Sequence, residues 1–440
     1  MKTSTSFYAS ILLCLCLSMT SYSQSFVSVR GSHFQLEGQP YYFLGTNFWY
    51  GMNLASKGPG GDRARLLKEL DQLAALGVTN LRIMGGSEGP DTSPWRMTPS
   101  LQVAPGVYNE ELWDGLDFLL AEMGKRNLKA VVCLNNFWPW SGGFTQYHTW
   151  VKEEAIPYPP PAENGSWFKY MLFSSRFYKN QKAMKLYEEH IKRVLNRTNC
   201  YTHKRYLDDP TIMSWQLANE PRGMFRFRSY RKWIRKAAQF IKSIDANHLV
   251  TIGSEGNTSS PTGNHFTKDH SFAAIDYMTI HIWIQNWQWY DPKTAATSFP
   301  KALGKAEKYL SNHLELAAKT NKPLVLEEFG IARDEDSHDP SATTAWRDRY
   351  YTAIFDWVYQ KAAAGTPMAG CNFWAWGGAG RPRTARAIWQ EGDDFIGDPP
   401  HEHQGWYSVY DKDSSTLAVL KNYGDKMAKI GKRRMDNSNQ

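Results

Sequence analysis

Residues 128–134 read LKAVVCL, an apolar run interrupted only by Lys129. Such a run is typical of a β-strand buried on both faces, as in a parallel sheet covered by helices. On either side, residues 110–125 and 178–194 carry apolar side chains at helical spacing. The three segments together predict a chain in which strands alternate with helices.

The alternation continues in both directions along the 440 residues. Eight strand-then-helix units predict a single (β/α)₈ TIM barrel with long loops at the C-terminal face of the strands, with a doubly wound open sheet as the alternative. No repeat and no linker rich in Pro, Ser or Thr divides the chain, so residues 25–430 are predicted to form one catalytic domain, followed by a basic tail at 431–440. The other predicted strands are 41–47, 78–84, 211–217, 248–252, 277–282, 323–329 and 371–376; further helices are expected near 63–76, 227–244, 302–319 and from about 345.

The first 24 residues have the features of a signal peptide. Lys2 gives a positive start, residues 11–17 are apolar, and Ser21 and Ser23 precede a cut before Gln24. The apolar run is too short to span a bilayer. We therefore expect a secreted protein, extracellular or periplasmic, without a membrane anchor.

Composition excludes several classes of protein. The net charge of +8 is concentrated in one predicted helix and at the C-terminus, without a nucleic-acid-binding motif, so no nucleic-acid partner is expected. Three cysteines remain after the leader, and the odd count argues against a disulfide framework. Cys133 and Cys371 lie in apolar strands and are expected to be buried thiols. No zinc spacing is present, and His401 and His403 are interpreted as surface or loop-packing residues. We expect a monomer that needs no metal or cofactor and keeps its activity in EDTA.

The chemistry of such barrels lies where the strands end. The predicted strand ends carry carboxylates, amides, cations and indoles, a set that favours a sugar site in a chain with 18 Trp and 23 Tyr. In strand order they are Arg82; Asn136 and Trp138; Asn219, Glu220 and Arg222; Glu255; His281 and Trp283; Glu327 and Glu328; and Trp374.

Glu220 and Glu328 end different strands and form the natural catalytic pair. Glycoside cleavage needs one carboxyl group to protonate the leaving oxygen and a second to attack the anomeric carbon or activate water. A gap of about 5–5.5 Å gives retention and one of roughly 6.5–9.5 Å gives inversion. The alternative is that each Glu is a structural ion-pair partner.

Three points stay open at this level. Strand alternation allows only one of Glu327 and Glu328 to face the mouth, and it does not say which. A nearby cation, for which Arg82 is the candidate, should keep the nucleophile ionised. Glu255 either binds sugar or forms a loop salt bridge.

The strand-end motifs resemble glycoside hydrolase family five, and more narrowly its β-mannanase subfamily. The resemblance runs from about Phe26 to about Tyr423. It implies that Glu220 is the acid/base and Glu328 the nucleophile, in a retaining enzyme. The matching stretches are LRI at 81–83, WQLANEPR at 215–222, HIW at 281–283, LEEFG at 326–330 and NFWAW at 372–376.

The resemblance also implies binding roles. Asn219 would hold the sugar 2-hydroxyl, Arg82 would bond to the nucleophile, His281 would line the cleavage subsite and Trp374 would lie beneath the sugar. Arg222 would face the leaving-group side, which favours mannan over cellulose. Asn136, Trp138 and Glu255 complete the expected substrate-binding set. Many family members have Tyr where this chain has Trp283, and an indole N–H can donate a hydrogen bond but not accept one.

The expected substrate is therefore a β-mannan polysaccharide or manno-oligosaccharide. We predict endo-acting cleavage of β-1,4-mannosidic linkages in mannan, glucomannan or galactomannan. An exo-acting β-mannosidase and a β-1,4-glucanase are the enzymatic alternatives, and a non-catalytic glycan-binding protein is the alternative from another class. A serine hydrolase built on Ser87 in GGSEG is disfavoured, because prolines and not a helix follow it.

Overall fold

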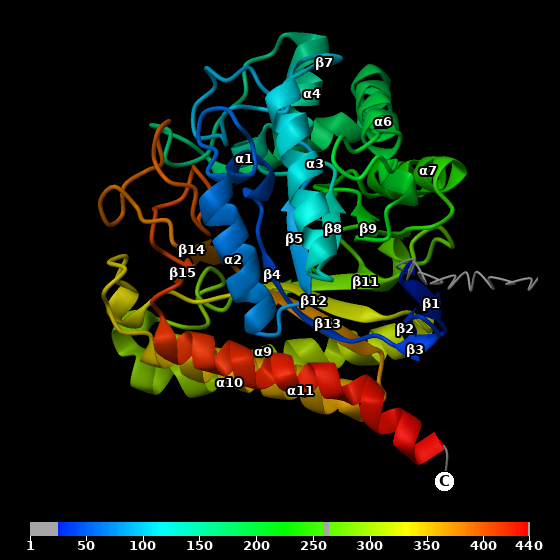
Figure 1. Ribbon diagram of the computed structural model, residues 1–440. Helices are drawn as coiled ribbons and strands as arrows, with labels where there is room; N and C mark the ends of the chain where they lie inside the picture. The colour runs from blue at the N-terminus through cyan, green and yellow to red at the C-terminus, as the bar shows by residue number, and fades with distance from the viewer. Residues whose placement is uncertain (1–24, 258–263, 439–440) are drawn as a thin grey trace, which may run out of the picture.

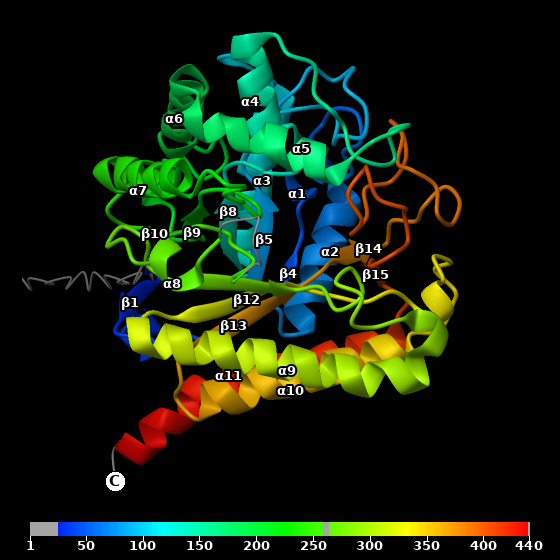
Figure 2. The ribbon, with the colours of Figure 1, turned by 180° about the vertical axis from the view of Figure 1, so that it is seen from behind.

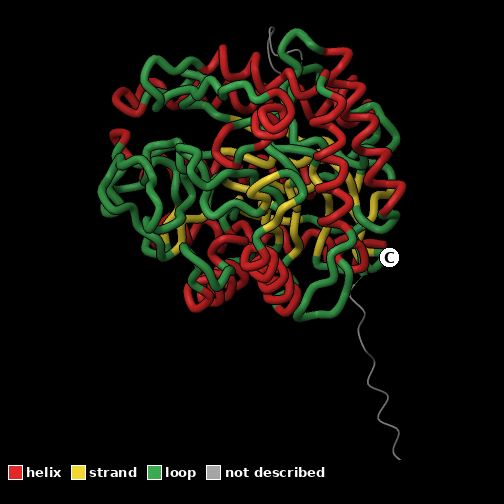
Figure 3. The backbone as a smooth tube through the Cα atoms, turned by 90° about the horizontal axis from the view of Figure 1, so that it is seen from above, coloured by secondary structure: helices red, strands yellow, loops and turns green. Residues whose placement is uncertain are grey.

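The computed structural model describes residues 25–257 and 264–438. Eight parallel strands form one sheet in the order β10-β9-β8-β5-β4-β13-β12-β11. They occupy the centre of the molecule when it is viewed from above, and helices surround them (Figure 3). The strands are β4 (Phe43–Asn47), β5 (Asn80–Met84), β8 (Lys129–Cys133), β9 (Ile212–Gln216), β10 (Leu249–Thr251), β11 (Met278–Ile282), β12 (Leu324–Phe329) and β13 (Met368–Phe373).

Backbone hydrogen bonds join the two end strands of the sheet. The Asp276 amide donates to the Val250 carbonyl at 2.8 Å, and the His281 amide donates to the Glu255 carbonyl at 3.1 Å. The predicted TIM barrel is therefore confirmed, and the open-sheet alternative is wrong. The eighth strand begins three residues earlier than expected, because Gly370 pairs with Phe43 of β4.

Each barrel strand is followed by a helix on the outside of the barrel (Figure 1). The helices cover the outer face of the sheet and the side chains of the strands fill the inside, so every residue of the eight strands is buried. Helices α9, α10 and α11 lie side by side (Figures 1 and 2). The helices are α2 (Arg63–Ala75), α3 (Glu110–Lys125), α6 (Gln181–Leu195), α7 (Phe227–Ile244), α8 (Phe266–Asp269), α9 (Ala295–Thr320), α10 (Ala345–Ala363) and α11 (Ser414–Ser438). Residues 431–438, expected to be a tail, continue the backbone of α11.

Additional short elements interrupt the loops. Helices α4 and α5 lie above the barrel strands, within the long loop after β8 (Figure 2). These elements are α1 (Gly51–Leu54), α4 (Gly143–Lys152) and α5 (Trp167–Ser174); β6 (Gln102–Ala104), β7 (Val107–Tyr108), β14 (Trp376–Gly378) and β15 (Val409–Tyr410); and the 3₁₀ turns η1 (Pro139–Ser141), η2 (Ser175–Lys179), η3 (Tyr206–Asp208), η4 (Pro292–Thr294) and η5 (Asp334–Asp336).

A small antiparallel sheet covers the N-terminal end of the barrel. Its strands are β1 (Ser28–Arg30), β2 (His33–Leu36) and β3 (Gln39–Pro40). Phe34 packs edge-on against Tyr277 with ring centroids 5.2 Å apart, within a buried cluster of residues from the beginnings of the strands. Because this end is closed by apolar packing, only the opposite end is available for chemistry.

Other expectations concern the cysteines and the membrane. Cys133 and Cys371 are buried free thiols, as predicted. Across residues 25–257 and 264–438, no helix has the length and apolar character needed to cross a bilayer. The predicted signal peptide, residues 1–24, lies outside the described residues.

Candidate active site

The two predicted catalytic carboxylates face one point at the C-terminal end of the barrel. Glu328 is the fifth residue of β12, and Glu220 lies four residues beyond the end of β9. His281 on β11 lies between them, with its Nδ1 2.6 Å from Glu220 Oε1 and 3.2 Å from Glu328 Oε2. One oxygen of each carboxylate and a ring nitrogen of His281 all lie within 4.8 Å of one another. This separation fits the spacing of about 5–5.5 Å in retaining glycosidases better than that of inverting ones.

Local backbone geometry turns Glu220 into the mouth. Its φ is +48°, an uncommon value for a residue with a side chain, and such values are concentrated at functional sites. Its amide donates to the Gly253 carbonyl at 2.9 Å, which fixes the turn to the next strand. Gly253 has φ +83°, and a Cβ there would lie 2.0 Å from the Ala218 carbonyl oxygen. Only glycine lets the two strand ends approach this closely.

Arg82 is the cation beside Glu328. Its Nη1 lies 2.5 Å from Glu328 Oε1, and its Nη2 donates to Asn219 Oδ1 at 2.7 Å. It also donates to the side-chain oxygens of Asn47 and Gln216, and its Nε lies 3.8 Å from Glu327 Oε2. Burial lowers the pKa of Arg82, but Glu328 and Glu327 outweigh this and raise it above its usual value. The guanidinium thus places a fixed positive charge directly against the Glu328 carboxylate.

The structure separates Glu327 from Glu328. Glu327 is fully buried, and its Oε2 accepts from Gln216 Nε2 at 2.6 Å inside the barrel. The register between β11 and β12 shifts at this point, so that Ile280 pairs with Leu326 and His281 with Glu328, and both Glu side chains reach Arg82 and His281. Of the two, Glu328 lines the pocket, as the resemblance implied.

His281 is held in its protonated form by the surrounding carboxylates. Burial lowers its pKa, but Glu328, Glu220 and Glu327 together raise the pKa well above its usual value. An imidazolium here donates to one carboxylate while its charge stabilises both. Glu220, His281 and Glu328 also form a group, within the described part of the chain, that is compact enough to hold a metal ion. The ligand atoms of this group already contact one another, and Glu328 also contacts Arg82.

Trp138 and Arg222 lie beside the acid/base. The Trp138 indole donates to Glu220 Oε2 at 2.7 Å, and the Arg222 guanidinium lies over the indole ring at 4.8 Å. Arg222 in turn forms two hydrogen bonds with Glu255, of 2.6 and 2.7 Å. Of the two interpretations of Glu255, the salt bridge is therefore formed, although its side chain also lines the pocket.

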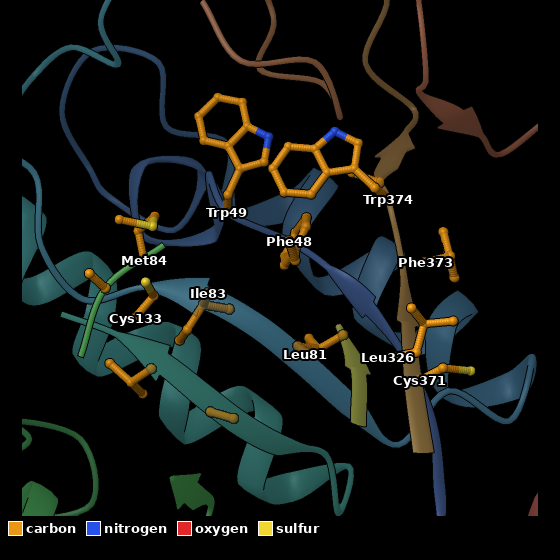
Figure 4. Close-up of a cluster of buried hydrophobic side chains, with 14 of the residues drawn as sticks. Phe48, Trp49, Leu81, Ile83, Met84, Cys133, Leu326, Cys371, Phe373 and Trp374 are labelled. Carbon is orange, nitrogen blue, oxygen red and sulfur yellow. The ribbon is translucent and has the colours of Figure 1, made fainter. Parts of the chain in front are cut away.

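The remaining predicted residues divide into two groups. Asn219 and Trp374 line the pocket; Trp374 lies beside Trp49, above the apolar layer made by Leu81 and Leu326 (Figure 4). Asn136 does not line it, and its expected contact with substrate is not supported. The Asn136 amide bonds to Asn219 and Ser141 and is fully buried, because the chain folds α4 and η1 over it.

Trp283 also lines the pocket but makes no hydrogen bond to Glu328 within the described residues. Its ring packs edge-on against Trp374, at 5.8 Å between centroids, and at a tilt against Tyr407, at 5.3 Å. The indole thus supports the sugar platform by packing, and it does not replace the hydroxyl of the usual Tyr.

Sequence reasoning missed much of the pocket wall, the parts of residues 156–167 and 388–407 that line the site. The cavity has a volume of about 590 Å³, a size suited to a small ligand. His401, Glu402 and His403 line it; His403 is exposed and His401 packs against Trp167, so the two histidines are surface and loop-packing residues that also face the pocket. The only signal was their position in a long loop after the eighth strand. The wall residues that line the cavity are Pro160, Pro161, Trp167, Ile388, Pro399, His401, Glu402, His403, Trp406 and Tyr407.

The two parts of the wall meet above the barrel. The rings of Trp167 on α5 and His401 lie 5.7 Å apart, edge to face. The segments follow the third and eighth strands, which are separated in the sheet by β5 and β4. The contact therefore bridges one side of the mouth.

A family model described as GH family 5 beta-mannosidase-like matches residues 24–432. The chain belongs to this family. It is a glycoside hydrolase. A solved glycoside hydrolase family 5 mannosidase from Rhizomucor miehei is 40% identical, with TM-score 0.86, covering 93% of this chain and 99% of that one.

Curated relatives of the family come from plants. A putative mannan endo-1,4-beta-mannosidase 4 of Arabidopsis thaliana is 32% identical over 371 residues, 80% of this chain and 83% of the relative. Mannan endo-1,4-beta-mannosidase 5 of Solanum lycopersicum is 31% identical over 366 residues, 80% and 81% of the two chains. An endo-1,4-beta-mannanase from Rhizomucor miehei, at 24% identity and TM-score 0.67, shares the fold.

Proposed function

We propose that the protein hydrolyses β-1,4-mannosidic linkages with retention of configuration. This proposal rests on the arrangement of two carboxylates. Glu220 and Glu328 face a common point, and Arg82 contacts Oε1 of Glu328. The mannan relatives and the family 5 mannosidase structures support the sugar, and Arg222 beside Glu220 supports it further. We propose endo action as the primary mode, in mannan, glucomannan or galactomannan.

The proposed reaction has two steps. The Glu328 carboxylate attacks the anomeric carbon while Glu220 gives its proton to the glycosidic oxygen, so the carbon–oxygen bond breaks and the leaving sugar departs with that proton. A water then gives a proton to Glu220 and attacks the same carbon, which frees Glu328. Trp138 orients Glu220 through Oε2. Arg82 stabilises the negative charge of Glu328 before the attack and as it is released, and His281 stabilises the Glu220 carboxylate that remains after the proton has left.

Exo action is the second candidate, and one observation favours it. The Trp167–His401 contact bridges the mouth on the side of strands β4 and β5, and a closed side limits how far a chain extends past the cleavage point. The mannosidase from Rhizomucor miehei, the more similar of the two solved relatives compared, supports the same alternative.

Early products from mannohexaose separate these modes, with cellohexaose as the control. Internal products such as mannotriose indicate endo action, whereas mannose and mannopentaose alone indicate exo action. Release of an anomer of inverted configuration, measured by proton NMR, would contradict the retaining mechanism. Equal cleavage of cellohexaose would contradict the assignment of mannose as the sugar.

We further propose that the mature protein begins at Gln24 and is secreted as a monomer. Residues 1–23, which precede this cut, support secretion by their composition, and both catalytic carboxylates come from the same barrel, so that one chain is enough to build the site. Sequencing the N-terminus of protein from the culture medium or periplasm tests the first point, and light scattering after gel filtration tests the second.

A further inference from the structure

The direction of the leaving group follows from the acid/base. Glu220 protonates the glycosidic oxygen, so the leaving sugar lies on the side of Glu220 that faces away from Glu328. Trp138, bonded to Glu220, lies on this side, and Trp167 packs edge-on against it at 5.5 Å between ring centroids. The leaving-group side of the pocket therefore borders α5.

Two chain segments meet at this border. Trp167 and Met171, one turn apart on α5, both line the pocket, as does Arg222 from the loop after β9. Arg222 Nη1 lies 3.2 Å from Met171 Sδ. Arg226 Nη1 donates to the Ser175 hydroxyl, directly after α5, at 2.8 Å. These contacts hold α5 and the 222–227 loop together as one continuous surface.

The surface carries a concentration of exposed aromatic side chains. Four of the six large hydrophobic residues that are exposed in the described chain lie on these two segments: Trp167 at 38%, Phe168 at 48%, Phe225 at 54% and Phe227 at 41%. Of the six, only Trp167 lines the pocket itself; Phe168 follows it in α5, Phe225 and Phe227 follow the pocket residue Arg222, and Val107 and Tyr201 lie on other segments. Exposed apolar groups that adjoin a pocket mark a ligand-binding surface more often than scattered ones do.

The backbone of the loop also points to a function. Met224 and Phe225 have φ values of +43° and +62°, so two consecutive residues with side chains adopt the left-handed region. That region is disfavoured for bulky residues. In this conformation Met224 is fully buried while Phe225 is exposed.

We propose that Phe168, Phe225 and Phe227 form an aromatic rim that binds the sugar residues of a β-mannan chain beyond the first leaving-group position. The proposal rests on the proposed function. Its occupant is neutral polysaccharide because the rim continues directly from the pocket wall at Trp167, and the apolar faces of sugar rings match aromatic side chains. The rim extends the site on the side that the Trp167–His401 contact leaves open.

The test compares a long and a short substrate. In the triple variant Phe168→Ser, Phe225→Ser, Phe227→Ser, we expect kcat/KM for mannohexaose to fall about tenfold or more through a higher KM. We expect kcat/KM for p-nitrophenyl β-mannoside to stay unchanged, because its leaving group carries no further sugar. Val107→Ser and Tyr201→Ser are the matched controls, and both should leave the two substrates unaffected.

Two results would overturn the rim. An equal loss on both substrates shows an effect on the catalytic centre, and no loss on either shows that the rim touches no sugar. If the triple variant loses binding to anionic phospholipid vesicles while its mannohexaose kinetics stay unchanged, the rim binds a membrane surface and not the polysaccharide. Failure of the unaltered enzyme to cleave mannohexaose would instead refute the proposed function, so the two failures are distinguishable.

Discussion

The floor and the wall of the pocket face the same cavity but are held by different interactions. The floor is made by strand-end residues: Arg82, Asn219, Glu220, His281 and Glu328. They are fixed by the barrel hydrogen bonds and by one another, through charged contacts such as Arg82–Glu328 at 2.5 Å. The wall is held by loop-to-loop contacts, such as the one between Trp167 and His401. The floor residues therefore carry out the chemistry, whereas the wall residues determine which substrates reach the floor.

The largest effects should come from the floor carboxylates. Glu328→Gln and Glu220→Gln should each lower kcat by at least about three powers of ten, because each removes a group that acts in the transition state. Circular dichroism should show the fold intact. Azide should restore turnover to Glu328→Ala by acting as the external nucleophile. Near-normal turnover in either Gln variant would contradict the assignment of Glu220 and Glu328 as the catalytic pair.

The second largest effect is expected for His281→Gln. This variant should lose about two powers of ten in kcat, because a preorganised charge is removed. The raised pKa also predicts an imidazolium at pH 7. The pKa of His281 is higher in the folded than in the unfolded protein. The contribution of His281 to the free energy of unfolding is therefore full below about pH 6.5 and is lost as pH rises through the raised pKa. Nitrogen NMR of labelled histidine measures this. A neutral His281 ring at pH 7 contradicts it.

Asp336 tests the wall. Its Oδ1 accepts from Gln285 Nε2 at 2.8 Å and from Trp406 Nε1 at 3.1 Å, so it joins the loops after β11 and β13. Asp336→Ala should raise KM for mannohexaose about tenfold with little change in kcat, since a positioning contact is lost and the floor is untouched. Asp336→Asn keeps an acceptor oxygen and should recover most of the affinity. A loss of kcat in the Ala variant would show that wall and floor are coupled.

The smallest effect is on stability and concerns Glu88, which anchors the start of α4 through the Gly143 amide at 2.8 Å. Burial raises the pKa of Glu88 to about 8. The unfolded chain ionises at lower pH, so stability should fall by a few kcal/mol between about pH 4.5 and pH 8. Glu88→Gln should flatten this part of the profile in urea unfolding. An unchanged slope would show that Glu88 is ionised in the folded protein.

How far sequence reasoning reached differs between the two regions. Most of the floor was predictable because a parallel barrel brings every strand end to one face, so a strand assignment also assigns a place in the mouth. Asn136 is the exception: it occupies a strand end, but η1 and α4 cover it. The wall residues His401 and Glu402 lie far in sequence from the eighth barrel strand, and nothing local indicates which way their loop folds.

The sequence by itself determined the barrel, the order of its strands and the two carboxylates, because alternating burial and strand-end chemistry are local properties of the chain. Only the tertiary structure decided that Glu328 and not Glu327 faces the cavity by contact, that Glu255 pairs with Arg222, and that Trp167 meets His401. These depend on distances between segments that follow different strands, and such distances are set by packing of the whole molecule.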